Sequence, residues 1–223
     1  MKKRIKVDGA IASFVIIMTA FVSHFHQWNE TNRYLDNLLD FLGLMLILNG
    51  TYIRMAARGH KKASSALGKE LVMTGPYSFV RNPMYLGTFL IGSGFILILW
   101  PWWTWPIFVG LFYLRFHRQM IQEEEHLKKL FGAEYQAYLE KVPRFFPTFD
   151  KLRRVKVYET FPWKEAWTTK ETALWGWAGV AFGLETMKEN FIMGYSDFSE
   201  TVFIFVLAVA VFFIGLMWEY SRR

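Results

Sequence analysis

Residues 71–87 read LVMTGPYSFVRNPMYLG and lead from a basic, polar segment into a long apolar one. Gly75-Pro76 marks a turn. The pair Asn82-Pro83 disfavours helix at Asn82, and proline suits the first turn of a helix, so a helix is predicted to begin at Pro83. The apolar run that follows continues to Trp100, long enough to cross a bilayer. The stretch therefore predicts a turn at a membrane surface that leads directly into a spanning helix.

Apolar segments of similar length occur on both sides of this one. A spanning helix needs about 20 mostly apolar residues, and the predicted spans are Gly9–Gln27, Asp36–Ala57, Pro83–Trp100, Trp102–His117 and Thr201–Tyr220. Thr172–Leu184 is apolar but short, so it could be a sixth span, an interfacial helix or a re-entrant helix. We therefore expect an all-α integral membrane helical bundle with about 5–6 transmembrane helices and cytoplasmic amphipathic helices.

The composition excludes several classes of protein. Hydrophobic residues make up 53 % of the 223 residues and aromatic residues 19 %, too much apolar mass for a soluble domain of this size. There is no cysteine, so disulfides, thiolate nucleophiles and thiolate metal sites are excluded. His24 and His26 cannot share one helix face, and no metal site is expected. The net charge of +7 lies beside apolar runs, which favours membrane lipids over nucleic acid as the partner.

The distribution of charge predicts the topology. Residues 1–6, the loop Arg54–Arg81 and the stretch after the fourth span are basic, which places the N-terminus in the cytoplasm. Glu185–Glu200 is acidic and the chain ends in Arg222-Arg223, so six crossings are favoured over five. We expect an inner-membrane protein in a bacterium or an endoplasmic reticulum protein in a eukaryote. Residues 1–147 are predicted to form a four-span core, and 148–223 an appended C-terminal helical hairpin.

Arg81 and Asn82 are the first candidate functional residues. They lie where the third span begins, and the free N–H groups and positive dipole end of a helix start form an anion site. The alternative is a membrane-surface turn with Arg81 on a lipid phosphate, and residue chemistry alone favours that alternative.

The segment Met120–Val142 is predicted to be an amphipathic helix. Its apolar residues recur at helical spacing, and charged residues occupy the other face; the apolar face consists of Met120, Leu127, Phe131, Tyr135, Tyr138 and Val142. Glu123-Glu124-Glu125 begins the segment close to the membrane. These acids either pair with Lys128 and Lys129 on a solvated face, or receive a cation or sugar hydroxyls, and the residues alone leave both readings open.

Taken together, the two segments resemble isoprenylcysteine carboxyl methyltransferase and its relatives among the phospholipid methyltransferases. The resemblance covers about residues 67–147 and depends on order and spacing as well as on residue type. Its elements are Thr74–Tyr77, Arg81–Tyr85, Glu123-Glu124, Phe131-Gly132, Glu134-Tyr135, Tyr138 and Val142-Pro143…Pro147.

The resemblance implies S-adenosylmethionine as the cofactor, bound on the cytoplasmic side without a soluble nucleotide-binding domain. By position, the implied cofactor-binding residues are Glu70, Leu71, Val72, Tyr77, Arg81, Asn82, Pro83, Met84, Tyr85, Glu123 and Glu124. The donor's carboxylate suits the helix start near Arg81 and Asn82, and Glu123 suits the ribose hydroxyls or the amino group. Tyr77 and Tyr85 would face the sulfonium or stack on adenine.

The implied substrate-binding residues are Arg118, Gln119, Tyr135 and Tyr138. Many relatives have His where this chain has Asn82, so proton transfer by that side chain is excluded. The family also tends to place Arg where this chain has Gln119, with Arg118 about 100° away on the helix, which puts a carboxylate acceptor in doubt.

These observations predict an S-adenosylmethionine-dependent membrane methyltransferase whose acceptor is an apolar, lipid-like or isoprenoid small molecule. Methyl transfer from a sulfonium is an in-line displacement, so no residue is expected to be a covalent nucleophile, and positioning supplies much of the rate. The alternatives are a sterol-type NADPH-dependent membrane reductase and a non-catalytic lipid-binding membrane protein.

Overall fold

The computed structural model describes residues 33–65, 70–148, 166–167, 169–188 and 198–221, and all regular structure in these ranges is helical. The predicted span Gly9–Gln27 lies outside the described residues. In chain order the elements are α2 (Arg33–Ser64), η2 (Gly75–Ser78), α3 (Pro83–Leu99), η3 (Trp102–Thr104), α4 (Trp105–Lys141), η5 (Lys170–Trp175), α7 (Gly176–Met187) and α8 (Phe198–Ser221). The described part of the chain thus confirms the predicted all-α class.

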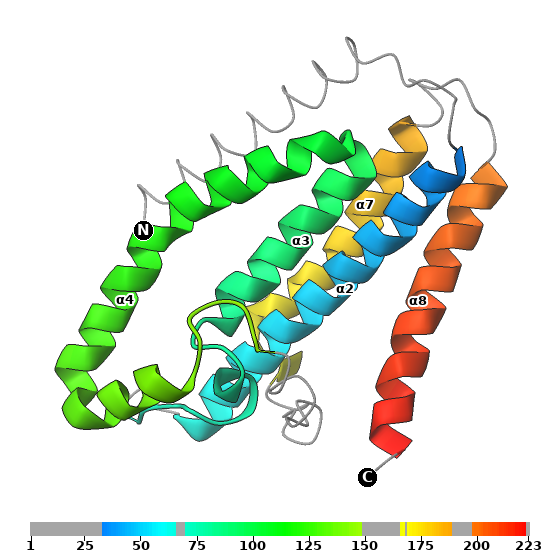
Figure 1. Ribbon diagram of the computed structural model, residues 1–223. Coiled ribbons are helices and arrows are strands. Elements are labelled where there is room, and N and C mark those ends of the chain that lie inside the picture. The colour runs from blue at the N-terminus through cyan, green and yellow to red at the C-terminus, as the bar shows by residue number, and fades with distance from the viewer. Residues whose placement is uncertain (1–32, 66–69, 149–165, 168, 189–197, 222–223) are drawn as a thin grey trace.

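Helices α2 and α3 run antiparallel and form the centre of the bundle (Figure 1). Their backbones approach closely because glycines face each other across the interface: Gly50 lies against Gly87, and Gly43 against Gly94. A Cβ added at Gly50 would lie 2.6 Å from the carbonyl oxygen of Gly87 and 2.9 Å from Cγ1 of Ile91. Small residues that permit such contact are typical of helix pairs in membranes.

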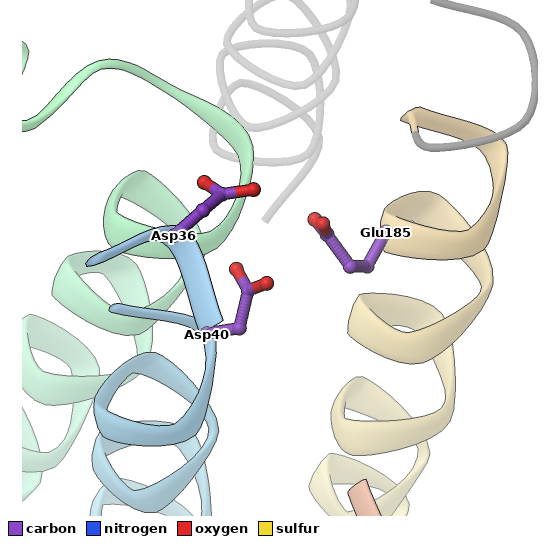
Figure 2. A group of neighbouring side chains, drawn as sticks. All are labelled: Asp36, Asp40 and Glu185. Atoms are coloured by element: carbon purple, nitrogen blue, oxygen red, sulfur yellow. The ribbon is translucent and has the colours of Figure 1, made fainter. Parts of the chain in front are cut away.

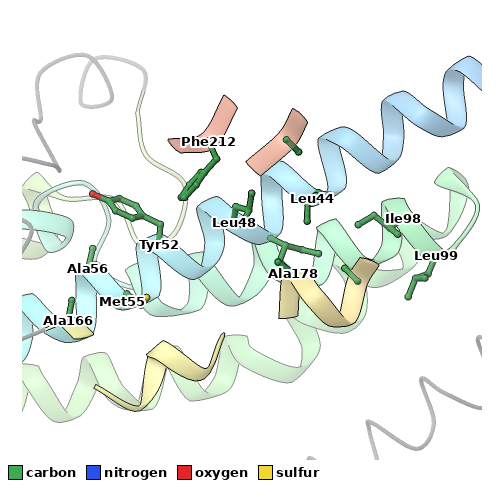
Figure 3. Close-up of a cluster of buried hydrophobic side chains, with 13 residues drawn as sticks. Leu44, Leu48, Tyr52, Met55, Ala56, Ile98, Leu99, Ala166, Ala178 and Phe212 are labelled. Carbon is green, nitrogen blue, oxygen red and sulfur yellow. The ribbon is translucent and has the colours of Figure 1, made fainter. Parts of the chain in front are cut away.

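The main core joins these two helices to the C-terminal part of the chain. Ala178 and Ala181 of α7, and Ala208 and Phe212 of α8, belong to the same buried cluster as residues of α2 and α3 such as Leu48 (Figure 3). Helices α7 and α8 therefore pack on α2 directly. The predicted division of the chain after residue 147 stays a prediction.

Helix α4 diverges from α3 and then bends back toward the end of α2 (Figure 1). Pro106 lies in its first turn. The predicted fourth span and the predicted amphipathic helix are both parts of this one element, which is interrupted at Gly132 with φ 54° and ψ −123°. Only glycine adopts that conformation readily. The interruption turns the last part of α4, with Tyr135 and Tyr138, against the loop before η2.

Length and composition identify one helix in the described chain that could cross a membrane, Tyr34–Ser64. Pro83–Leu99 and Ser199–Ile214 are apolar but shorter, and the short apolar segment expected at Thr172–Leu184 forms η5 and α7. The count of 5–6 spans therefore stays a prediction. Large apolar side chains are nonetheless exposed along α4 and α8, among them Ile107, Leu111, Leu114, Phe203, Val206 and Ile214.

The glycine contact between α2 and α3 can be tested with a matched pair of alanine substitutions. Gly50→Ala places a methyl group against backbone atoms that cannot rotate away, and overpacking of this kind costs about 1–3 kcal/mol. Gly110→Ala on α4 meets nothing within 4 Å and should leave stability unchanged or raise it slightly. Thermal unfolding in detergent should show a lower midpoint for the first variant only; equal midpoints would contradict close α2–α3 packing.

Candidate functional site

Glu124 of α4 is a buried carboxylate that joins three segments of the chain. Arg144 forms a two-pronged ion pair with it, with Nε 3.1 Å from Oε1 and Nη2 2.9 Å from Oε2. Arg81 Nη1 lies 3.4 Å from Oε2, and Asn82 Nδ2 donates to Oε1 at 3.1 Å. Asn82 also donates to the Arg144 carbonyl, and the Arg81 N–H donates to the Pro143 carbonyl at 2.9 Å. These contacts fix the turn before α3 against α4 and the segment that follows it.

The η2 turn is held from two sides. The Tyr138 hydroxyl donates to the Tyr77 carbonyl at 2.6 Å from the end of α4. From α2, His60 Nε2 lies 2.8 Å from the Thr74 hydroxyl. Gly75 has φ +57°, and a Cβ there would lie 2.9 Å from the His60 ring. Glycine is therefore required at this position both by the backbone conformation and by the contact.

Glu123, the neighbour of Glu124 in sequence, is exposed and is oriented rather than neutralised. The Tyr85 hydroxyl donates to its Oε1 at 2.7 Å, and Gln119 Nε2 donates to the same oxygen at 3.1 Å. The Tyr85 ring packs against Phe116, with centroids 5.5 Å apart. Because neither donor is charged, Glu123 keeps a net negative charge in a fixed position, as a binding group for a cation or for hydroxyls requires.

A second buried carboxylate, Glu171 of η5, lies on the α2 side of the site. Arg54 Nη2 forms an ion pair with Glu171 Oε2 at 2.8 Å, and Arg58 Nε lies 3.9 Å from Oε1. Arg54 also donates to Thr88 Oγ1 and, at 3.4 Å, to the carbonyl of Met84. The C-terminal part of the chain is thus connected through Arg54 to the first turns of α3.

Burial controls the protonation of the tyrosines around η2. It raises the pKa of Tyr77 to about 12; the charge of Arg58 acts in the lowering direction and that of Glu123 in the raising direction. Burial likewise raises the pKa of Tyr135 to about 12, assisted by the charge of Glu124, and raises that of Tyr138. These phenols are therefore neutral hydrogen-bond donors at physiological pH.

Three of the predicted cofactor-binding residues, Glu124, Arg81 and Asn82, form contacts that hold the fold together around the site. Glu124 is saturated by two arginines and one amide, Arg81 pairs with it, and Asn82 is buried with its amide directed at Glu124 and Arg144. The assignment of Arg81, Asn82 and Glu124 to the cofactor stays a prediction, and the structure adds that the Arg81 and Asn82 side chains both contact Glu124. The physical reason is that the buried Glu124 carboxylate requires compensating charge.

The assignment of Tyr135 and Tyr138 to the substrate also stays a prediction. Both side chains are buried and pack beside Leu71 and Met73, the residues that lead into η2. Of the other predicted pair, Gln119 contacts Glu123 and Arg118 is exposed on α4.

The remaining predicted residues surround η2 and Glu123. Tyr77 lies in η2, and Pro83, Met84 and Tyr85 form the first turn of α3. Glu70 is exposed, Leu71 and Val72 are half-buried, and Pro83 is buried. Together with Glu123, Tyr77 and Tyr85, they form the candidate site at the end of the bundle where α2 ends and α3 begins (Figure 1).

Sequence reasoning missed Arg144, Arg54 and Glu171. Arg144 directly follows Val142-Pro143, an element of the recognised pattern, and that position was the only available signal. Arg54 and Glu171 are 117 residues apart, and nothing local in the sequence indicates that they meet.

A separate cluster of buried charges lies at the other end of the bundle. Asp36 and Asp40 of α2 face Glu185 of α7 (Figure 2), with carboxylate oxygens all within 4.8 Å of one another. Lys188 Nζ lies 2.8 Å from Glu185 Oε1, 3.5 Å from Asp36 Oδ2 and 4.0 Å from Asp40 Oδ1, and donates to the Ile98 carbonyl at 2.8 Å. The ammonium supplies positive charge to the three acids, and the cluster ties α7 to α2 and α3.

Residues 38–134 match the family model described as phospholipid methyltransferase. The chain is 34 % identical over 113 residues to the protein-S-isoprenylcysteine O-methyltransferase of Saccharomyces cerevisiae, covering 47 % of each chain. It is 30 % identical over 122 residues to that of Schizosaccharomyces pombe, covering 51 % of this chain and 50 % of that one. This chain spans about half the length of these two enzymes. The predicted resemblance is confirmed, and the matches support a methyltransferase.

Other relatives carry different names. The nickel-cobalt-cadmium resistance protein NccN of Alcaligenes xylosoxydans xylosoxydans is 26 % identical over 159 residues, 70 % of each chain. The Delta(14)-sterol reductase LBR of Gallus gallus is 33 % identical over 85 residues, which are 37 % of this chain and 13 % of that protein. This last match is too partial to favour the reductase alternative. No solved structure matches the chain significantly.

The two adjacent acids should respond differently to loss of charge. Glu124→Gln leaves Arg81 buried without its counter-charge; removing one partner of a buried ion pair costs about 3–5 kcal/mol, less here because the Arg144 side chain is 40 % exposed. Glu123→Gln removes an exposed charge and should leave stability nearly unchanged. The unfolding midpoint in detergent distinguishes the two, and a large loss for Glu123→Gln would contradict the assignment.

The raised pKa values of Tyr77 and Tyr135 predict alkaline destabilisation. Their folded pKa of about 12 exceeds the ordinary 10.0, so the folded state binds these protons more tightly. Their contribution to stability is complete below pH 10 and is lost as pH rises through 12. Tyrosinate ultraviolet absorbance of the folded protein should show phenols that titrate late, and Tyr77→Phe should remove one of them. Titration of every tyrosine near pH 10 would refute the burial of these groups.

Proposed function

We propose, from its likeness to phospholipid methyltransferases and isoprenylcysteine O-methyltransferases, that this chain is an S-adenosylmethionine-dependent methyltransferase embedded in a membrane. The observation that carries the proposal is Glu123, an exposed carboxylate fixed by Tyr85 and Gln119 beside the turn that the family pattern marks. S-adenosylmethionine supplies an electrophilic methyl group on a sulfonium. The protein then has to bind and orient the two reactants and exclude water.

The residues at the site suit this cofactor. Glu123 offers a carboxylate for the amino group or the ribose hydroxyls, because its hydrogen-bond donors within the described residues, Tyr85 and Gln119, are both neutral. Tyr77 and Tyr85 offer aromatic faces, which attract a cation such as a sulfonium. Glu70, Leu71 and Val72 adjoin η2 and provide half-buried and exposed surface for the nucleoside part.

A lipid-like acceptor is favoured by the aromatic side chains between α3 and α4. Phe89 of α3 contacts Phe112 of α4 at 5.1 Å and Phe145 at 5.5 Å between ring centroids. Phe112 contacts Phe116 at 4.6 Å, and Phe116 contacts Tyr85, the donor to Glu123. An apolar wall therefore leads from the exposed apolar face of α4 to the candidate site. An acceptor that dissolves in the bilayer would follow this wall to the methyl donor.

The residues that support the site are not proposed as nucleophiles, because the acceptor can attack the sulfonium methyl group directly. Glu124, Arg81 and Arg144 neutralise one another beneath the site, and the buried tyrosines stay protonated. Neither set is available for covalent chemistry. The proposed role of the protein is therefore positioning, and the acceptor atom itself attacks the methyl group.

Cofactor binding gives the direct test. Calorimetry of the detergent-purified protein should show micromolar binding of S-adenosylhomocysteine and none of NADPH. Glu123→Ala removes a charge-assisted contact worth about 1.5–3 kcal/mol, so affinity should fall about 10- to 100-fold. Glu125→Ala, an exposed acid two residues away, is the control and should bind normally.

The outcomes separate the candidate functions. Binding of NADPH alone would favour the sterol-type reductase, and binding of neither ligand would favour a non-catalytic lipid-binding protein. Normal binding by Glu123→Ala would remove Glu123 from the site.

A further inference from the structure

We propose that Arg58 of α2 is a ligand-binding residue of this site, that it receives a carboxylate group, and that the buried Glu171 holds it in position. The inference rests on the proposed function and extends it. It names a residue on α2 and assigns a role to the C-terminal segment that carries Glu171.

The antiparallel register of α2 and α3 places Arg58 beside the start of α3. Gly50 lies against Gly87, and Arg54 both packs on Gly87 and reaches the Met84 carbonyl. Arg58 is one turn further along α2, about 6 Å toward the end where α3 begins. The element it approaches there is η2, which α2 contacts. Arg58 therefore lies in the part of α2 nearest η2, where its charge acts on Tyr77.

Arg58 is suited to bind an anion because its neighbours are already paired. Arg81 and Arg144 are ion-paired to Glu124, and Arg54 is ion-paired to Glu171. Arg58 approaches Glu171 only at 3.9 Å, through Nε, and its side chain is 48 % exposed. The two terminal nitrogens of its guanidinium, which form the two-pronged face for a carboxylate, are not used by that contact.

Opposite charges border the same phenol. Arg58 and Glu123 act on the pKa of Tyr77 in opposite directions, although burial dominates. A cation and a carboxylate that both act on one tyrosine match a ligand that carries both a carboxylate and an ammonium. The amino-acid end of S-adenosylmethionine carries both groups, whereas an acceptor with a carboxylate carries only the carboxylate. The shared feature is the carboxylate.

Glu171 restricts the position of the Arg58 side chain. Its carboxylate is buried, and it contacts Arg54 closely and Arg58 loosely. The tight pair fixes Glu171 against α2, and the loose contact directs Arg58 while its outer nitrogens stay accessible. An arginine held in this way loses less side-chain entropy when it binds a ligand.

The test compares ligands with and without the carboxylate. The variants are Arg58→Ala, Arg58→Lys and, as control, Lys129→Ala, an exposed cation on α4. Calorimetry uses S-adenosylhomocysteine and its decarboxylated analogue, and thermal unfolding checks that each variant is folded. If the carboxylate is the donor's, Arg58→Ala should bind S-adenosylhomocysteine at least tenfold more weakly and the analogue as wild type does. Arg58→Lys should bind S-adenosylhomocysteine with intermediate affinity, because lysine keeps the positive charge but lacks the two parallel N–H donors of the guanidinium.

A second arm covers an acceptor carboxylate. Initial rates with an N-acetyl-S-prenylcysteine would then show a KM raised at least tenfold by Arg58→Ala, with kcat little changed and S-adenosylhomocysteine binding normal. Its carboxamide, which cannot accept a methyl group, serves as a competitive inhibitor, and its inhibition constant should be the same for Arg58→Ala and wild type. Normal donor binding and normal KM in a folded Arg58→Ala, or in a folded Arg58→Lys if alanine unfolds the protein, would overturn the proposal and leave the methyltransferase function intact. Failure of the wild-type chain to bind S-adenosylhomocysteine would overturn both.

Discussion

Glu124 is a buried carboxylate, and the segments around the site are held together because they supply its hydrogen-bond and ion-pair partners. A buried carboxylate is tolerated only when paired and hydrogen-bonded. Here the partners come from the turn before α3 and from the segment after α4, since Arg81, Asn82 and Arg144 all contact it. The arrangement also determines where α3 begins, because the residue just before Pro83 is held by its side chain. One ion-pair network thereby positions the η2 turn and the first turn of α3.

Adjacent residues on a helix lie about 100° apart, so Glu123 and Glu124 point in different directions and have different partners. The buried Glu124 is ion-paired with two arginines, whereas the exposed Glu123 accepts, among the described residues, from the neutral donors Tyr85 and Gln119. The interruption at Gly132 completes the arrangement. Without it, the end of α4 would continue straight, and Tyr138 could not reach the carbonyl of Tyr77. The helix break at Gly132 and the ion pairs of Glu124 thus both help to hold the segment between η2 and α3 in place.

Much of this fold could be predicted because it depends on local signals. The Asn82-Pro83 pair predicted the start of α3, Gly75-Pro76 predicted the η2 turn, and helical spacing predicted the buried face that carries Tyr135. Long-range pairing was not predictable. A run of three glutamates does not reveal which one faces inward, so nothing in the sequence indicated that Glu124 is buried against Arg81 while Glu123 is exposed. The contact of Tyr138 with the Tyr77 carbonyl was not predictable either, because these residues are 61 positions apart in the sequence.

The C-terminal part of the chain also contributes a charged residue, Glu171, near the site. Glu171 lies outside residues 38–134, yet it is buried against Arg54, which in turn contacts the first turns of α3. A buried carboxylate so close to the site has an electrostatic effect on every ligand that binds there, unless it is neutralised. Arg54 supplies that neutralisation, and the second arginine on the same face of α2 is then in excess. The local balance on the α2 side is therefore positive, while Glu123 makes the α4 side negative. In the proposed site, a ligand with separated charges would bind with its anionic end toward Arg58 and its cationic end toward Glu123, and Glu171 contributes through its contacts with Arg54 and Arg58.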